Sequence, residues 1–246
     1  MKLKEILEHL DTISPFELQE KWDNSGLMVG NLESQISKIV LSIDLDSELI
    51  ESSDEGVLFI VHHPLIFGGL KNLDFAKYPA NLIQKLILKN QSVIAMHTNF
   101  DKTHLNKYVF SEVLGFSIEQ ESDFVAKSSV NLTFEQLGKK IKEKLNLDQI
   151  KVVNKKESIN SIAITTGSGG SLIDFVDVDC FLTGDIKYHD AIKAKEQDLM
   201  LIDIGHFESE RFFANAMQNL LKTLPISVII AQSKNPFEII TLKDIR

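Results

Sequence analysis

The chain has 246 residues, of which 43% are hydrophobic and 25% charged, a composition that places it among ordinary globular proteins rather than fibrous or low-complexity ones. Its formal net charge of −9 argues against nucleic-acid binding that depends on neutralising phosphates. No apolar run approaches the ~20 residues of a membrane span, and the first residues do not resemble a secretory signal. A single cysteine, Cys180, excludes an internal disulfide. We therefore expect a cytoplasmic protein with no membrane segment.

Strands and helices are predicted to alternate along the first half of the chain. Helical spacing of apolar residues marks the helices, and short apolar runs mark the strands. This order favours a parallel α/β sheet. The predicted elements, in chain order, are residues 2–10, 39–43, 46–55, 57–61, 79–89, 93–96 and 105–114.

The second half follows a polar stretch over residues 119–131 and repeats the alternation. We predict an α/β fold of two similar lobes, 1–120 and 121–246, with mixed, mostly parallel sheets and a metal site in the cleft between them. The alternative is that the halves are intertwined as one domain. The predicted elements here are residues 133–145, 150–153, 162–165, 180–182, 186–195, 199–204, 207–221, 226–231 and 237–242.

Three of the predicted strands end in histidines and carboxylates. His62 and His63 follow the strand at 57–61. His97 and Asp101 follow the next strand, and His206 begins the segment after 199–204. In open α/β sheets the carboxyl ends of strands border the ligand site. Imidazole and carboxylate ligands together suit zinc, iron or manganese, so the sequence predicts a metal site at this edge.

Neighbouring histidines on an extended backbone start toward opposite faces, so His62 and His63 would chelate one ion only awkwardly. Two ions with one imidazole each resolve this difficulty. Glu210 lies four residues after His206, so the two side chains would share one face of a helix. This spacing favours Glu210 over Glu208 as the carboxylate that binds metal beside His206. A bridging water would complete an open site of this kind. The predicted metal ligands are His62, His63, Asp101, His206 and Glu210.

Two further histidines are candidate catalytic residues. His97 precedes Asp101 by four and is either an acid/base group or a histidine held by a strand-end hydrogen bond. His189 begins a predicted helix beside the same sheet edge and could contact substrate or transfer a proton. The Gly167–Gly170 loop opens a helix and is either a tight turn or a weak anion site, because it lacks the lysine of a P-loop.

Several motifs occur together in one order. They are Trp22-Asp23-Asn24 with Gly26-Leu27 and Gly30, His62-His63-Pro64-Leu65, His97-Thr98-Asn99-Phe100-Asp101, Thr183-Gly184-Asp185 and Gly205-His206-x-x-x-Glu210. Over nearly its whole length the chain resembles the Nif-three-like family (NGG-one-interacting factor), often labelled GTP cyclohydrolase I type 2.

The resemblance implies a two-lobed α/β fold, a dinuclear centre held by the five predicted ligands, and a ring-shaped homohexamer. Two departures from the family pattern stand out. The family often has Glu where this chain has Asp185, which leaves the role of that carboxylate open. The family also often has a Gly-rich turn where this chain has residues 102–105.

The leading functional hypothesis is a hydrolase that uses two divalent ions on a nucleotide or a similar small phosphorylated molecule. The family label implies GTP, with ring opening and formate release. Lys187, Arg211 and the Gly167–Gly170 loop would then be candidate phosphate contacts. The rivals are a metal-binding assembly or regulatory protein without turnover, and a phosphate-ester hydrolase on the same metal cluster.

Overall fold

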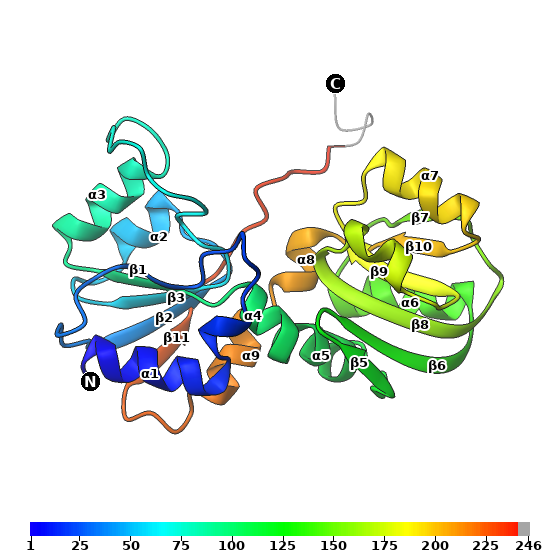
Figure 1. Cartoon of the computed structure of the whole chain (residues 1–246), viewed down its shortest axis with the longest axis horizontal. Helices are drawn as coiled ribbons and strands as arrows, with labels where there is room; N and C mark the ends of the chain where they lie inside the picture. Colours follow the sequence, from blue (N-terminus) through cyan, green and yellow to red (C-terminus); the bar gives the residue numbers. More distant parts are fainter. Residues whose placement is uncertain (241–246) are drawn as a thin grey trace.

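Two mixed β-sheets, each with helices on both faces, form the two lobes that lie side by side in Figure 1. The computed structural model describes residues 1–240. The α/β architecture and the mixed sheets agree with the prediction from sequence. Within residues 1–240, no helix combines the length and the apolar character that crossing a membrane requires.

The first sheet has the strand order β1-β4-β3-β2-β11, and only the β1–β4 pair is antiparallel. Its central strands are buried along their whole length because helices cover both faces, as in parallel sheets generally. The strands are β1 (Gly26–Val29), β2 (Lys38–Ser42), β3 (Leu58–Val61), β4 (Ser92–Ala95) and β11 (Ser227–Ile230).

Helices α1 (Leu3–Ile13) and α9 (Phe213–Leu220) cover one face of the first sheet. Helices α2 (Ser47–Ser52) and α3 (Ala80–Leu88) cover the other. A 3₁₀ turn, Phe16–Leu18, follows α1.

The second sheet has the order β5-β6-β8-β9-β10-β7, with a parallel centre of β8, β9 and β10. Its outer pairings are antiparallel. The strands are β5 (Gln120–Ser122), β6 (Val125–Thr133), β7 (Lys151–Val153), β8 (Ser158–Ser168), β9 (Cys180–Gly184) and β10 (Met200–Asp203).

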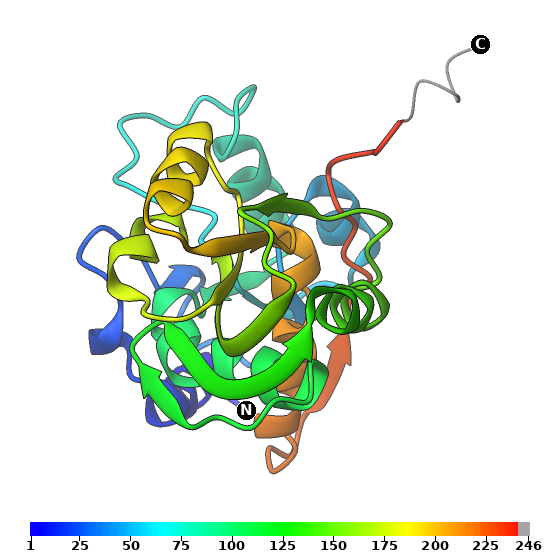
Figure 2. The same cartoon turned by 90° about the vertical axis from the view of Figure 1, so that its right-hand side faces the viewer.

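Helices also cover both faces of this second sheet, as the view onto the second lobe in Figure 2 shows. Helix α6 (Phe134–Leu145) packs on one face and begins at Thr133, whose hydroxyl accepts a hydrogen bond from the backbone N–H of Gln136. Helix α7 (Tyr188–Glu196) and the 3₁₀ segment Gly170–Phe175 pack on the other face.

A helical segment over residues 98–113 lies between the lobes (Figure 1). It starts earlier than the predicted helix at 105 and contains two π-helical stretches, Asp101–Leu105 and Val109–Val113. Single π-helical turns occur frequently at functional sites. Buried side chains of this segment join one apolar core that reaches into both lobes, so the lobes share their packing.

The end of the described chain departs from the predicted division at residues 120 and 121. Strand β11 pairs in parallel with β2, so residues 227–230 belong to the first sheet, although the sequence division assigns them to the second lobe. Buried residues of α9, such as Phe213 and Met217, and the half-buried Val228 of β11 pack in the apolar core that also contains α1 of the first lobe. The strand predicted over residues 237–242 does not form over 237–240, and its last two residues lie outside the described part of the chain.

Candidate metal centre

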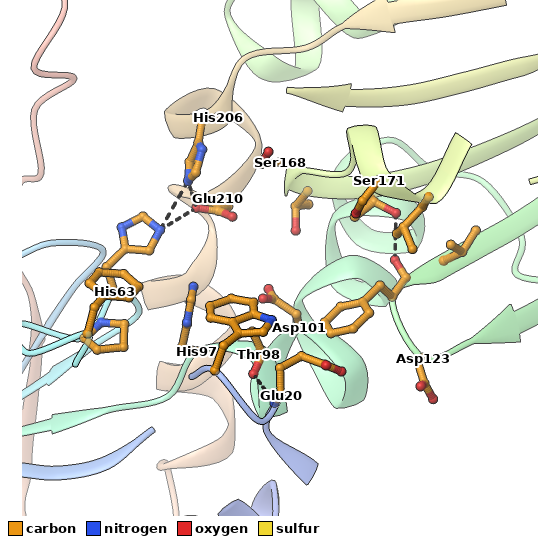
Figure 3. Close-up of a pocket in the computed structure, with 18 of the residues that line it drawn as sticks. Glu20, His63, His97, Thr98, Asp101, Asp123, Ser168, Ser171, His206 and Glu210 are labelled. Atoms are coloured by element: carbon orange, nitrogen blue, oxygen red, sulfur yellow. Dashed lines mark hydrogen bonds and ion pairs between the residues drawn. The ribbon is translucent and has the colours of Figure 1, made fainter. Parts of the chain in front are cut away.

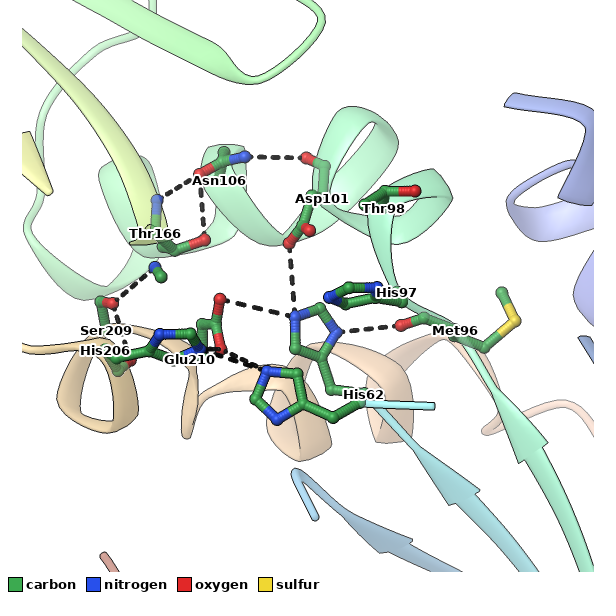
Figure 4. Close-up of polar contacts among 12 residues, drawn as sticks. His62, Met96, His97, Thr98, Asp101, Asn106, Thr166, His206, Ser209 and Glu210 are labelled. Atoms are coloured by element: carbon green, nitrogen blue, oxygen red, sulfur yellow. Dashed lines mark hydrogen bonds and ion pairs between the residues drawn. The ribbon is translucent and has the colours of Figure 1, made fainter. Parts of the chain in front are cut away.

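The carboxyl ends of the parallel strands in both sheets meet at the cleft between the lobes. His62 and His63 follow β3, Asp101 follows β4 within the helical segment, and helix α8 (His206–Glu210) follows β10. All five predicted ligand residues therefore meet at one place, although up to 148 positions separate them in sequence. Figure 4 shows His62, Asp101, His206 and Glu210 converging.

The carboxylate of Glu210 divides the cluster into two groups of donors. Its Oε1 lies 3.7 Å from His62 Nε2, which lies 3.5 Å from Asp101 Oδ1. Its Oε2 lies 3.0 Å from His63 Nε2 and 2.9 Å from His206 Nε2. Each group holds three donor atoms close enough to share one cation. Adjacent histidines therefore serve different groups.

Two donor atoms are buried without a hydrogen-bond partner. His62 Nε2 and Asp101 Oδ1 are both unpaired within residues 1–240. A buried polar atom without a partner costs roughly 1–3 kcal/mol, more when charged. A cation bound between them would satisfy both atoms, so the side chains fit a metal ion.

In each predicted ligand histidine, Nδ1 is the ring nitrogen that does not face the cluster, and it donates a hydrogen bond to an oxygen atom. His62 Nδ1 donates to the carbonyl of Met96 at 2.9 Å. His63 Nδ1 donates to Asp44 at 2.8 Å, and His206 Nδ1 donates to Asp185 at 2.7 Å. These contacts leave Nε2 to face the cluster, and carboxylate–histidine pairs of this kind orient metal ligands and raise their basicity. The carboxylate of Asp185 thus has a defined position, although it is one methylene shorter than Glu.

The protonation of the metal-free cluster is uneven. Burial lowers the pKa of His62, which favours its neutral, metal-binding form. Burial opposes protonation of His63, but hydrogen bonds to Asp44 and Glu210 outweigh it and raise its pKa to about 10. The hydrogen bond between His206 and Glu210 is the main reason that the pKa of His206 is raised to about 9.

The two buried carboxylates shift in opposite directions. Burial and then the charge of Glu210 raise the pKa of Asp101 well above its usual range. Burial also acts against ionisation of Glu210, but the surrounding imidazoles outweigh it and hold the pKa of Glu210 well below its usual range. The ionised Glu210 thus compensates the positive charge of the protonated histidines.

His97 lies beside the cluster and is held from behind by Asp23. Its Nδ1 donates to Asp23 Oδ1 at 2.8 Å, and its ring centroid lies 5.2 Å from that of His62. Burial raises the pKa of Asp23, but hydrogen bonds from His97 and Thr98 outweigh it and keep that pKa below its ordinary value. The fixed imidazole could transfer protons or contribute a further ligand, since its free nitrogen is also close to His62 and His63.

A cavity of about 1030 Å³ opens on the cluster, and Figure 3 shows the side chains that surround it. His63, His97, Asp101, His206 and Glu210 all line this cavity. The remaining wall contains residues of both lobes, such as Trp22 and Phe175. A small molecule in the cavity would therefore touch the predicted ligands directly.

Several predicted residues lie elsewhere. His189 is exposed on the first turn of α7 and does not line the cavity, so the structure does not bring it to the cluster. Arg211 donates to the carbonyl of Leu145, and Lys187 faces a separate cavity. Glu208 accepts a hydrogen bond from Asn235 and lines the same separate cavity as Lys187.

The Gly167–Gly170 loop packs against Glu210, and two of its backbone N–H groups are hydrogen-bonded within the protein. The Gly167 N–H donates to Ser209, and the Gly169 N–H donates to Thr183. Gly167 has φ +64°, and a Cβ there would overlap the Glu210 carboxylate. The loop must therefore be glycine at this position for Glu210 to reach the cluster.

Sequence reasoning missed three supporting side chains. Asp44 follows β2 at the same sheet edge, so the rule that ligand-type residues follow strand ends could have found it. Asp23 lies in a motif that had no assigned role. Asn106 donates to the carbonyl of Asp101 in the π-helical stretch and accepts from Thr166, a contact that no sequence pattern indicates.

Comparison with known proteins places the chain in a family. The family model described as Duf34/NIF3 (NGG1p interacting factor 3) matches residues 1–236. The chain is 50% identical over 239 residues to a Campylobacter jejuni protein named "GTP cyclohydrolase 1 type 2 homolog", covering 97% of this chain and 99% of that protein. A Helicobacter pylori protein named "GTP cyclohydrolase 1 type 2" is 42% identical over 240 residues, with 97% and 99% coverage.

Solved structures share the fold. Staphylococcus aureus protein SA1388 superposes with a TM-score of 0.87 at 26% identity, covering 98% of this chain and 99% of that one. Reduced HcgD from Methanocaldococcus jannaschii superposes with a TM-score of 0.81 at 26% identity, with 94% and 97% coverage. Since the family model spans nearly the whole chain, this protein belongs to the Duf34/NIF3 family.

Proposed function

We propose that this protein is a hydrolase that depends on two divalent metal ions and acts on a nucleotide or a similar small phosphorylated molecule. The observation that carries the proposal is the position of Glu210, whose two oxygens each face a separate group of donors. The imidazole and carboxylate donors suit zinc, iron or manganese. When bound, two such ions would lower the pKa of a shared water molecule and supply a nucleophile near neutral pH.

The surrounding residues support turnover over a purely structural role for the metals. Structural metal sites are closed by protein ligands, whereas catalytic sites keep an open position. Here the cavity of about 1030 Å³ reaches the cluster directly. His97 is held by Asp23 at the cavity wall, where it can accept and return a proton during the reaction.

The finer proposal is that the substrate is GTP, which rests on the names of the relatives from Campylobacter jejuni and Helicobacter pylori. One water would add to C8 of the guanine and open the five-membered ring to a formamide, and a second water would hydrolyse that formamide and release formate. His97 would take the proton of the attacking water and pass it to the ring nitrogen that is released.

The test is to measure metal per subunit and formate release from GTP for the metal-loaded protein. The Asp101→Ala variant should lose metal and formate release together. Asp177→Ala, an exposed carboxylate outside the cluster, is the matched control and should retain both. Formate release equal in the protein and in Asp101→Ala would remove GTP as substrate. Two tightly held ions without turnover on GTP or a panel of phosphate esters would favour the non-catalytic alternative.

The family resemblance also implies a homohexamer, which we include in the proposal. The subunit mass is 27.7 kDa, so light scattering on the purified protein distinguishes a hexamer from a monomer or dimer directly. A particle of the monomer mass would remove this part of the proposal and leave the metal centre unaffected.

A further inference from the structure

Four exposed aromatic side chains surround the cavity beside the candidate metal centre. We name this set the aromatic rim; its members, with their exposed fractions, are Trp22 (61%), Phe67 (51%), Tyr78 (67%) and Phe175 (74%). Large exposed apolar side chains that gather at a cavity mark a binding site rather than ordinary surface. The aromatic rim therefore offers a surface for a ligand that enters the cavity.

The aromatic rim reaches the predicted reaction centre through His97. The ring of Trp22 lies edge-on to His97 with centroids 5.9 Å apart, and Phe67 lies edge-on at 5.8 Å. Figure 3 shows Thr98, Glu20 and Asp101 on the same side of the cavity as His97. A flat ring stacked on Trp22 would thus lie next to both the proton-transfer group and the metal ligands.

Apart from the candidate metal centre itself, the described part of the cavity wall provides carboxylates but no lysine or arginine. None of the residues within 1–240 that line it is Lys or Arg, whereas Glu20, Asp44 and Asp123 line it in addition to the predicted ligands. Lys102 comes near but is occupied, because its Nζ lies 2.7 Å from Glu20 and over the ring of Phe124. Proteins hold polyphosphates with Lys, Arg and free backbone N–H groups.

We propose that the cavity recognises the flat, uncharged heterocycle of its substrate and is nearly indifferent to phosphate. The aromatic rim would stack on the ring, and the carboxylates of Glu20 and Asp123 would accept hydrogen bonds from its N–H edge. The inference rests on the proposed function and narrows its substrate class to nucleoside-like molecules. The phosphates of a nucleotide would extend toward solvent.

A second cavity of about 1000 Å³, on the other side of His63 and His206, is the rival place for phosphates. It contains Lys151 and Lys187, but Lys151 Nζ lies 3.6 Å from Asp203. Carboxylates outnumber the lysines on its wall; they are Asp44, Asp185, Asp203 and Glu208. This balance disfavours a polyanion there, and Lys187→Ala tests the point.

Trp22 is the only tryptophan of the chain, so its fluorescence reports directly on the cavity. The zinc-loaded protein should be titrated with guanosine, GMP and GTP, with inorganic tripolyphosphate as competitor. We expect all three to quench Trp22 with dissociation constants within about threefold of one another. Guanosine binding should also be insensitive to salt, because no ionic contact is involved.

Three results would overturn the proposal. One is GTP binding more than about thirtyfold tighter than guanosine, and another is displacement of guanosine by tripolyphosphate while the metal content stays intact. The third is no quenching by guanosine at millimolar concentration with the metal content intact. This last result refutes the heterocycle site alone, whereas the proposed function fails only if metal binding or turnover is absent.

Variants of the aromatic rim give a second test that does not need the fluorophore. In equilibrium dialysis, Trp22→Ala should weaken guanosine binding about tenfold, as loss of a stacking partner does. Trp22→Phe should retain most of it. Leu88→Ala, which truncates a more exposed apolar side chain outside both cavities, should retain all of it. Unchanged binding in Trp22→Ala, or Lys187→Ala weakening GTP but not guanosine, would contradict the proposal.

Discussion

The backbone of Gly167 lies against the side chain of Glu210, and a Cβ at position 167 would overlap the Oε1 atom of that carboxylate. Gly167 lies one residue before the end of β8 and Glu210 ends α8, so the close approach joins two elements of the second lobe at the candidate metal centre. Since Glu210 faces both donor groups, the absence of a side chain at residue 167 sets the position of the shared carboxylate.

Gly167→Ala should therefore impair metal binding more than it impairs folding. The added methyl would displace Glu210, and the positive φ would add roughly 1–2 kcal/mol of backbone strain. Gly56→Ala is the matched control, because Gly56 has a similar φ of +68° and no atom within 4 Å of the added Cβ. We expect a lowered melting temperature in both variants and loss of metal, measured by elemental analysis, only in Gly167→Ala. Equal metal content in the two would contradict this role.

Asp185→Asn should weaken metal binding without unfolding the protein. The variant replaces the charged acceptor of His206 Nδ1 by an amide of the same shape, and Asn tolerates the φ of +52° at this position. Loss of a carboxylate behind a metal-bound histidine typically costs about 10- to 100-fold in affinity. Competition with a chromogenic chelator measures the change, and Asp177→Asn should show none. Affinity retained in Asp185→Asn would mean that Asp185 does not orient His206.

His97→Gln distinguishes a proton-transfer group from a metal ligand. If His97 transfers protons, the variant should keep its metal content and lose about 10²- to 10⁴-fold in the rate constant of turnover. Asp23→Asn should show a smaller loss of the same kind, because Asp23 only orients the imidazole. A fall in metal per subunit in His97→Gln would instead assign His97 as a ligand.

Metal binding should release protons and strengthen as the pH rises. His63, with a pKa of about 10, and His206, with a pKa of about 9, are both protonated in the metal-free protein at pH 7.5. Both must lose a proton before Nε2 can bind a cation, so binding should release at least two protons per subunit. Apparent affinity should rise with pH up to about 9 and level off above about 10.

Calorimetry in buffers of different ionisation enthalpy counts the protons released on binding. The variant His63→Gln removes one titrating group and should lower the count by about one. A count of zero at pH 7.5 in the unmodified protein would show that both histidines are already neutral before the metal arrives.

The sequence predicted the candidate site from histidines and carboxylates that directly follow predicted strands. Such a prediction needs only local sequence patterns. Short apolar runs before His62, His97 and His206 predict buried strands, and parallel strands bring their carboxyl ends to one edge. The four-residue spacing of His206 and Glu210 predicts their shared helical face, and the structure places Glu210 at 2.9 Å from His206. His189 begins a helix at the same sheet edge, yet its side chain is exposed, because local pattern does not decide which way a helix turns its first residue.

The sequence by itself determined the fold class, the residues that could bind metal and the edge at which they gather, because these follow from side-chain periodicity and chemistry along the chain. Only the tertiary structure decided that Asp44 and Asp185 orient the histidines, that Gly167 makes room for Glu210, and that β11 returns to the first sheet. These features depend on contacts between segments far apart in the chain, and a one-dimensional pattern carries no record of which distant surfaces pack together.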